Sequence, residues 1–384
     1  MSSYWLDELA APVRRRAPAG PPEVEIVGGG VTGCTAALVL AREGLRVRLH
    51  EAREIASGAS GRNGGFALRG GAMPYDVARR QLGAERAQAL WRLTERGLDH
   101  LEELAGDAFR RTGSLRLAAD PAERLELEAE HAALVGDGFD AEWEDDPGPV
   151  LRDLFHGAIR HPGDGALHPA RWVRRLAALA ADAGAELREG SDVTSLDELE
   201  APTVLLATDG YTRGLVPELD AAVRPARGQV LATEPLAQRL FACPHYARRG
   251  YDYWQQTPDG RLVVGGCRDA ALETEFTAEE ATTPGIQARI ERLVRDLVGE
   301  LPAVTHRWAG AFGVTEDRLP LAGRAPWREG LWLACGYSGH GNVLGLVCGE
   351  LVAQAIAGRP APELAPFDPG RLAPQGAGTD ESSW

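Results

Sequence analysis

A glycine-rich turn near the N-terminus places the strongest constraint on how this chain folds. Gly28, Gly30 and Gly33 form the spacing G-x-G-x-x-G. The turn follows the segment 24–27, with the sequence VEIV, and opens the apolar, alanine-rich segment 35–42. Val and Ile favour strands, whereas Ala and Leu favour helices. The sequence therefore predicts a strand, a tight glycine turn and a helix.

A second strand completes this unit. Residues 45–49 alternate Leu and Val with Arg, and the acidic Glu51 follows them. This context is typical of dinucleotide-binding units. Gly28 permits the tight turn, Gly30 lets backbone N–H groups approach a pyrophosphate, and Gly33 lets helix and strand pack closely. Glu51 would bind the adenosine ribose. The motif does not distinguish NAD from FAD.

A second glycine-rich run, GASGRNGGF, occupies residues 58–66. One glycine turn is enough for one phosphate group, so two such turns close together need an explanation.

Composition limits the possible functions and the compartment. A formal net charge of −15 opposes binding to phosphate backbones, so we expect no nucleic-acid partner. The chain has no Lys, and its five cysteines are scattered without metal-ligand spacing. We expect no metal site, reduced thiols and a cytoplasmic protein. We see no signal-peptide core and no apolar run of about eighteen residues, so we expect no membrane span.

The rest of the chain reads as a mixed α/β protein. Helices are predicted at 84–105, from Pro121 onward, and at 169–183, 284–298 and 343–356. Strands are predicted at 186–188, 203–207, 228–233, 250–256, 261–265 and 331–334, those from 228 to 265 forming an antiparallel sheet. The Pro- and Gly-rich tail after Gly358 is predicted to be a loosely packed extension.

Further segments carry a family likeness. They are Ser3-Tyr4-Trp5, His168-Pro169, 207–211, 227–229, 252–254, 260–266, 315–323 and 336–341. Together with 58–66 they resemble the D-amino-acid oxidase superfamily of flavoproteins, with the nearest likeness to gamma-glutamylputrescine oxidases. The resemblance runs in register from Ser3 to Ala357 and implies FAD. Because FAD is long, the first glycine turn would bind its pyrophosphate and the second would lie beside the ribityl chain and the isoalloxazine.

The resemblance also implies a domain organisation. We expect an α/β fold in which a Rossmann-like FAD-binding domain carries an inserted substrate domain, built on an antiparallel sheet with helices. The expected ranges are 22–83, 151–215 and 308–358 for the FAD-binding domain, 84–150 and 216–307 for the substrate domain, 1–21 for an N-terminal arm and 359–384 for a C-terminal tail.

The resemblance implies a set of FAD-binding residues. They are Gly28, Gly30, Val31, Thr32, Gly33, Glu51, Ala52, Arg53, Ala59, Ser60, Gly61, Arg62, Asn63, Gly64, Gly65, Val193, Ala207, Thr208, Gly210, Gly336, Tyr337, Ser338, Gly339, His340, Gly341 and Asn342. The run 339–342 precedes the final helix, whose positive N-terminus would stabilise negative charge at the pyrimidine end of the flavin. From spacing alone, GYSGHGN is equally compatible with a plain strand-to-helix turn.

The flavin is expected to be noncovalent. Relatives that attach FAD use a Cys where this chain has Gly310, or a His in the second glycine run, where it has Arg62 and Asn63.

Four residues are predicted to form the catalytic wall: Tyr253, His340, Arg62 and Phe312. Tyr253 matches a substrate-binding Tyr of glycine oxidases. The sequence is equally compatible with an aromatic side chain packed in the core of a sheet. For Trp254 and Phe312, a position in the hydrophobic core is the preferred interpretation. Arg62 and Arg268 could carry charge in the site or form structural ion pairs.

Two departures from the family pattern concern substrate and acceptor. Amino-acid oxidases place a carboxylate-binding Arg where this chain has Phe312. Simple α-amino acids should therefore be poor substrates, unless Arg268 or Arg62 reaches the carboxylate from another strand. Sarcosine oxidases use a Lys for dioxygen activation where this chain has Val263, which leaves the electron acceptor open.

The expected function is FAD-dependent oxidation of a small primary or secondary amine to an imine, with dioxygen or another acceptor re-oxidising the flavin. The alternatives are a hydroxyacid or alcohol dehydrogenase of the same fold, and a non-catalytic flavoprotein subunit.

Overall fold

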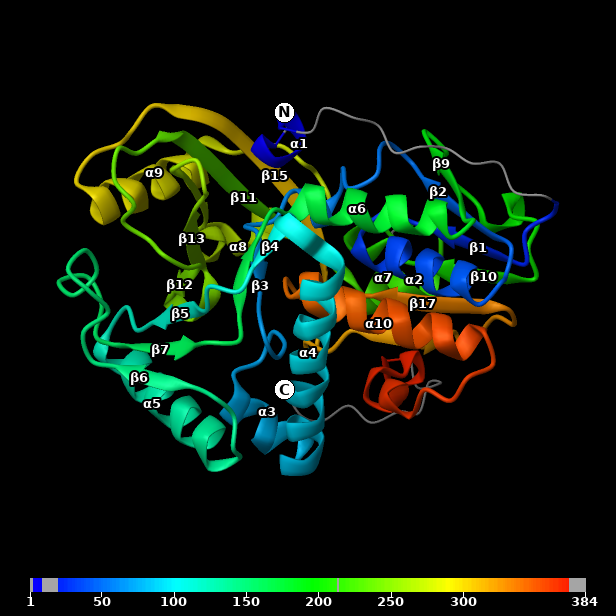
Figure 1. The fold of residues 1–384 in the computed structure, drawn as a ribbon, viewed down its shortest axis with the longest axis horizontal. Coiled ribbons are helices and arrows are strands. Elements are labelled where there is room, and N and C mark those ends of the chain that lie inside the picture. Colours follow the sequence, from blue (N-terminus) through cyan, green and yellow to red (C-terminus); the bar gives the residue numbers. More distant parts are fainter. Residues whose placement is uncertain (1–2, 9–19, 213, 373–384) are drawn as a thin grey trace.

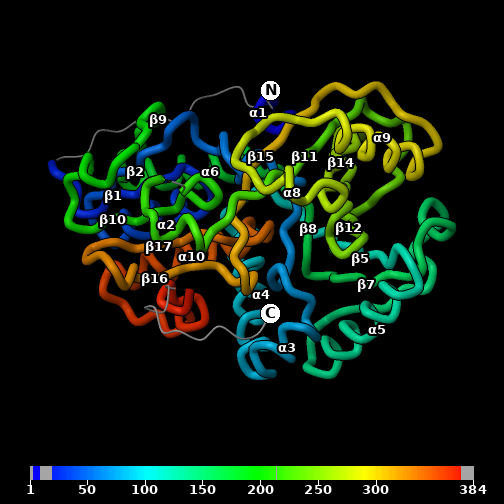
Figure 2. Tube along the Cα trace, turned by 180° about the vertical axis from the view of Figure 1, so that it is seen from behind, coloured from blue at the N-terminus to red at the C-terminus, as the bar shows by residue number. Residues whose placement is uncertain are grey.

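The protein's structure is a computed structural model that describes residues 3–8, 20–212 and 214–372. Its strands form a six-stranded, an eight-stranded and a three-stranded sheet. Figures 1 and 2 show the two large sheets at opposite ends of the molecule, with the long helix α4 between them. The expected mixed α/β fold with a second, antiparallel sheet is confirmed.

The six-stranded sheet has the order β16-β17-β10-β1-β2-β9. Its strands are β1 (Val24–Val27), β2 (Val47–Glu51), β9 (Glu186–Glu189), β10 (Thr203–Leu206), β16 (Leu321–Arg324) and β17 (Leu331–Cys335). All neighbours are parallel except β16 and β17. The strand–turn–helix unit predicted from the first glycine motif is confirmed.

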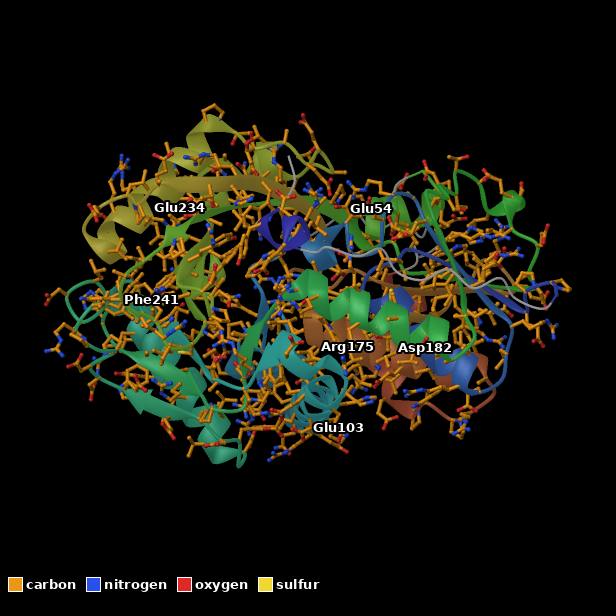
Figure 3. The ribbon with its side chains drawn as sticks, turned by 45° about the horizontal axis from the view of Figure 1, so that its top comes forward. Glu54, Glu103, Arg175, Asp182, Glu234 and Phe241 are labelled. Atoms are coloured by element: carbon orange, nitrogen blue, oxygen red, sulfur yellow. The ribbon has the colours of Figure 1, made fainter. Side chains whose placement is uncertain are left out.

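Three helices lie side by side on this sheet, with α2 between the other two (Figure 1). They are α2 (Val31–Arg42), α6 (Pro169–Asp182) and α10 (Gly341–Ile356). Most residues of α2 and α10 are buried, which explains their apolar composition. Helix α6 is amphipathic, and Figure 3 shows its exposed Arg175 and Asp182 together with Glu103 of α4.

The eight-stranded sheet has the order β15-β11-β14-β13-β12-β5-β7-β6. Its strands are β5 (Ser114–Leu117), β6 (Glu142–Glu144), β7 (Ala158–His161), β11 (Arg224–Pro235), β12 (His245–Ala247), β13 (Asp252–Gln256), β14 (Arg261–Gly266) and β15 (Val304–Val314). Neighbours are antiparallel except β5 and β12. A small third sheet contains β3 (Phe66–Ala67), β4 (Phe109–Arg110) and β8 (Gly165–Leu167).

The remaining helices connect and cover these sheets. They are α1 (Tyr4–Asp7), α3 (Tyr75–Leu82), α4 (Ala84–Ala105), α5 (Pro121–Gly136), α7 (Pro217–Ala222), α8 (Leu272–Glu275) and α9 (Pro284–Val298). The 3-10 turns are η1 (Ala59–Gly61), η2 (Gly106–Ala108), η3 (Leu196–Glu198), η4 (Asp209–Tyr211), η5 (Arg248–Gly250), η6 (Arg268–Ala271), η7 (Pro362–Phe367) and η8 (Pro369–Leu372). Among these described residues, no helix combines the length and apolar character needed to cross a bilayer.

Two expectations from the sequence need correction. The predicted strand 250–256 begins only at Asp252, because residues 248–250 form the turn η5. The described part of the tail is not loosely packed. Phe367 is 1% exposed, and Arg371 forms an ion pair with Asp317. The predicted arm and tail otherwise fall partly on residues 1–2, 9–19 and 373–384, which lie outside the described part.

The predicted domain boundaries stay a prediction. All strands of the six-stranded sheet fall within the ranges expected for the FAD-binding domain. However, those ranges also contain β7 and most of β15, which belong to the eight-stranded sheet.

Candidate functional site

Three glycine-containing turns meet at one edge of the six-stranded sheet. Strands β1, β10 and β17 are parallel neighbours, so their carboxyl ends lie together. The turns that follow them begin at Gly28, Ala207 and Gly336. In open α/β sheets, ligands bind outside the carboxyl ends of the strands. This edge is therefore the expected place for a cofactor.

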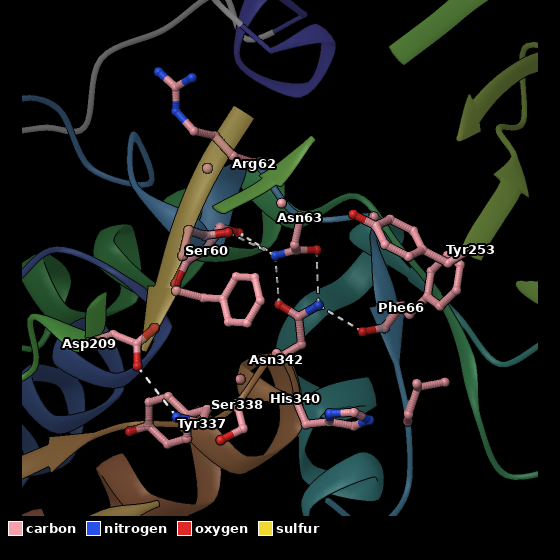
Figure 4. Close-up of a pocket in the computed structure, with 18 of the residues that line it drawn as sticks. Ser60, Arg62, Asn63, Phe66, Asp209, Tyr253, Tyr337, Ser338, His340 and Asn342 are labelled. Carbon is pink, nitrogen blue, oxygen red and sulfur yellow. Dashed lines mark hydrogen bonds between the residues drawn. The ribbon is translucent and has the colours of Figure 1, made fainter. Parts of the chain in front are cut away.

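A cavity opens at this edge, between the six-stranded and eight-stranded sheets, with about 1530 Å³ of space that is partly open to solvent. Many predicted site residues line it: Gly30, Val31, Thr32, Ala59, Ser60, Arg62, Asn63, Gly64, Ala207, Tyr253, Phe312, Tyr337, Ser338, Gly339, His340, Gly341 and Asn342. Figure 4 shows part of this wall.

The first glycine turn is shaped by close packing. Gly28 has φ +114°, and a Cβ there would lie 2.5 Å from the carbonyl oxygen of Ala207. A Cβ on Gly33 would lie 1.9 Å from the carbonyl oxygen of Gly28, so α2 packs directly on the turn. Gly30 is the N-cap of α2, with no side-chain cap, and it lines the cavity. The positive end of α2 thus opens into the cavity, where an anion would be stabilised.

Glu51 buttresses this turn from β2. One carboxylate oxygen accepts a hydrogen bond from the Gly29 N–H at 2.8 Å, and the other accepts from the Arg53 N–H at 2.9 Å. Burial raises the pKa of Glu51, and these two donors oppose that rise. The side chain of Arg53 is paired with Glu280. Binding of ribose by Glu51 stays a prediction.

The second glycine run lies against the first. The Ser60 hydroxyl accepts a hydrogen bond from the Val31 N–H at 3.1 Å, which joins η1 to the start of α2. Asn63 and Asn342 exchange amide hydrogen bonds of 3.1 Å, and Asn342 also donates to the Phe66 carbonyl oxygen at 2.7 Å (Figure 4). The two runs and the start of α10 therefore form one continuous wall.

A buried carboxylate that the sequence analysis did not select holds the third turn. Asp209, in η4, accepts hydrogen bonds from the N–H groups of Gly336 (2.8 Å), Gly313 (2.9 Å) and Tyr337 (3.4 Å). Burial raises the pKa of Asp209, and these donors oppose the rise. The only sequence signal was an acidic residue inside a glycine-containing turn, next to the selected Thr208 and Gly210.

Aromatic side chains form the opposite wall, which comes from the eight-stranded sheet. Tyr253 on β13 and Phe312 on β15 line the cavity, and Tyr246 and Tyr251, which the sequence analysis missed, extend this wall. No hydrogen bond joins the Tyr253 hydroxyl to another described residue. Phe312 lines the cavity and is only partly buried, so the core position favoured for it is wrong. Trp254 does lie in the core and stacks on His245.

Arg62 and His340 differ in how they meet the cavity. The Arg62 guanidinium donates to the carbonyl oxygens of Ser57 (2.6 Å) and Ala309 (3.3 Å), and Figure 4 shows it directed away from the asparagine pair. His340 occupies the N-cap position of α10, but its side chain makes no capping hydrogen bond. Its Nδ1 is buried without a hydrogen-bond partner in the described part of the chain. Burial lowers the pKa of His340 to about 4, so its ring is neutral near pH 7.

The other predicted cofactor residues do not line the cavity: Gly28, Gly33, Glu51, Ala52, Arg53, Gly61, Gly65, Val193, Thr208, Gly210 and Gly336. Several shape the wall from behind. Val193 packs in a hydrophobic cluster with Val27 and Leu206, and a Cβ on Gly210 would lie 2.7 Å from the Phe312 carbonyl carbon. Direct contact of these residues with a cofactor stays a prediction.

These residues fit a long, anionic, flat cofactor. The N-termini of α2 and α10, whose own N-cap residues make no side-chain capping hydrogen bond, open into the same cavity, next to glycines that leave room for backbone contact. His340 also lines this cavity, and its buried Nδ1 lacks a hydrogen-bond partner among the described residues. FAD has this shape and charge.

Comparisons with known proteins agree with this geometry. A probable oxidoreductase OrdL of Rhizobium meliloti is 31% identical over 88% of this chain and 83% of its own length. The gamma-glutamylputrescine oxidoreductase of Escherichia coli is 28% identical over 88% of this chain and 84% of its own. The crystal structure of glycine oxidase from Geobacillus kaustophilus superposes with a TM-score of 0.76 at 24% identity, covering 93% of this chain and all of that one.

The family comparison covers most of the sequence. Residues 23–355 match the model of the family DAO, described as FAD dependent oxidoreductase. This chain therefore belongs to the DAO family and is an FAD-dependent oxidoreductase.

Proposed function

We propose that this protein oxidises a small primary or secondary amine to an imine, and that dioxygen, giving hydrogen peroxide, or another acceptor takes the electrons. The observation that carries the proposal is the aromatic wall of Tyr253 and Phe312 facing the glycine turns across one cavity. Relatives support it, because they include a gamma-glutamylputrescine oxidoreductase and a glycine oxidase.

The proposed reaction asks little covalent chemistry of the protein. FAD, when bound, supplies the acceptor for a hydride. The amine loses that hydride from carbon and a proton from nitrogen, and water hydrolyses the imine. A wall of aromatic rings and glycine backbone would exclude water and favour the neutral amine over the ammonium ion. Tyr253 and Phe312 would orient the reacting C–H bond.

The chain would hold the cofactor through its helix ends. The N-terminus of α2, with Gly30 to Thr32, would bind the pyrophosphate, and the N-terminus of α10, with Gly341 and Asn342, would face the flavin ring. The partial positive charge of α10 would stabilise negative charge that gathers there on reduction. His340 would contribute as a neutral ring, since burial lowers its pKa to about 4.

We test the proposal by mixing the purified protein anaerobically with a panel of small amines and of hydroxyacids and alcohols. The expected result is bleaching of the flavin absorption by at least one amine, with release of the matching carbonyl product. Bleaching by hydroxyacids or alcohols alone would contradict the amine and favour the dehydrogenase alternative. A protein that no compound reduces, and that copurifies with a second polypeptide, would favour a non-catalytic subunit.

The same samples identify the electron acceptor. Admission of air to the reduced protein, with a peroxide assay, separates an oxidase from a dehydrogenase. Val263, which matches the position of the sarcosine oxidase Lys, is an uncharged side chain that is 1% exposed within β14, so this position offers no cation for dioxygen activation.

A further inference from the structure

The charged side chains that line the cavity differ in whether they have hydrogen-bond or ion-pair partners. Apart from the cavity-lining His340, they are Asp209, Arg62 and Arg268. Asp209 accepts three backbone hydrogen bonds, and Arg62 donates to two carbonyl oxygens. Arg268 forms no hydrogen bond or ion pair with any described residue. Its guanidinium carbon lies 5.1 Å from the ring centre of Tyr251 and 5.5 Å from that of Phe312.

Two acidic residues beside Arg268, Asp269 in the chain and Asp252 on the neighbouring strand β13, already have a cation. Asp252 lies 3.4 Å from the Arg248 guanidinium, and Asp269 pairs with the same side chain. A half-buried guanidinium between two aromatic rings gains cation–π attraction, but its N–H donors still need acceptors. An anion entering the cavity would satisfy them.

The geometry of the eight-stranded sheet brings Arg268 close to the aromatic wall. Arg268 follows β14, Tyr253 lies on β13 and Phe312 on β15, with β11 between β14 and β15. Gly228 of β11 has no side chain to separate them. A Cβ there would lie 3.6 Å from both the Phe312 ring and the Tyr253 hydroxyl. Arg268 and Tyr253 thus present two donor groups, without acceptors among the described residues, to one space.

We propose that Arg268 binds an anionic group of the substrate, with Tyr253 as a second donor, so that the oxidised amine also carries a carboxylate. This inference rests on the proposed function and names its substrate class. It reverses the expectation drawn from Phe312 alone. Phe312 supplies no hydrogen-bond donor, but the guanidinium of Arg268, which follows β14, lies beside its ring.

The test compares matched substrate pairs: methylamine with glycine, dimethylamine with sarcosine, and propylamine with 4-aminobutyrate. Flavin reduction is followed anaerobically in the wild type, in Arg268→Met, which keeps the side-chain length but loses the charge, and in Arg268→Lys. The exposed Arg292→Met of α9 is the matched control. We expect the carboxylated member of at least one pair to be preferred at least tenfold in second-order rate. Arg268→Met should lose that preference, Arg268→Lys should restore part of it, and Arg292→Met should keep it.

A binding titration decides the question without turnover. Acetate should perturb the flavin spectrum of the wild type and of Arg292→Met saturably, and Arg268→Met should bind acetate at least tenfold more weakly while keeping a full flavin complement. Equal acetate binding in both, flavin loss from Arg268→Met, or a preference for the uncarboxylated amines would overturn the inference. Amines that reduce the flavin without this preference would leave the proposed function standing. Acetate binding through Arg268 without reduction by any amine would refute the proposed function instead.

Discussion

At the scale of single residues, Asp209 shows how a buried charge organises a binding edge. Its carboxylate joins N–H groups from the end of β15 and from the turn after β17, while its own turn follows β10. Hydrogen bonds to a charged acceptor contribute more than neutral ones, about 1.5–3 kcal/mol each. Three segments that are distant in sequence are thereby fixed around one cavity.

The burial of His245 predicts that the protein's stability depends on pH. His245 is 3% exposed and stacks on Trp254, and burial lowers its pKa from 6.5 to about 3. Between these values the unfolded chain binds a proton that the folded protein does not. Stability should therefore fall as the pH falls from 6.5, by up to about 1.4 kcal/mol per pH unit from this residue.

We expect His245→Phe, which keeps the stacked ring, to flatten this dependence. The measurement is the urea midpoint of wild type and variant at pH 7 and pH 5 with saturating FAD. An unchanged difference between the two pH values would show that His245 does not carry the effect.

At the scale of elements, local patterns predicted more than long-range ones. Helix α5 was predicted from Pro121 onward, and in the structure the Asp120 side chain caps it by accepting from the Glu123 N–H at 2.8 Å. Strand β15 was missed, because its glycines and mixed side chains show no alternation. It is held by its pairing with β11, some eighty residues earlier in the chain.

The site residues also divide into those that local sequence patterns predict and those that long-range strand pairing positions. The glycine turns at Gly28 and Gly336 were predictable because each follows a strand and precedes a helix within a few residues. Tyr246 and Tyr251 could not be predicted from local sequence. They line the cavity only because β12 pairs with β13 and because the turn before β13 brings Tyr251 there.

The start of α2 provides a prediction at this scale. A Cβ on Gly30 would lie 2.8 Å from the Ser60 hydroxyl, so Gly30→Val should push the two glycine runs apart and fill the space beside the helix N-terminus. We expect bound FAD to fall below about a tenth of the wild-type content, since the pyrophosphate needs close backbone approach. Gly285→Val is the control, because a Cβ there meets nothing within 4 Å. A Gly30→Val protein that purifies with its full flavin would contradict this role.

At the scale of the whole molecule, the cavity exists because two sheets meet at one edge. The carboxyl ends of β1, β10 and β17 supply the glycine turns, and β13 and β15 bring the aromatic residues Tyr253 and Phe312 across from the other sheet. Cofactor and substrate would therefore be held by different sheets. This division explains how two glycine runs and a distant helix can serve one ligand.

We expect one FAD to lie noncovalently along both glycine runs, and acid precipitation of the purified protein is the sharpest test of this arrangement. FAD in the supernatant and in the protein pellet is quantified by chromatography and absorbance. We expect one intact FAD per chain in the supernatant and none in the pellet, because the family resemblance aligns Gly310, Arg62 and Asn63 with the positions at which some relatives attach the flavin. Flavin that stays with the precipitated protein, or a colourless protein that binds NAD instead, would contradict it.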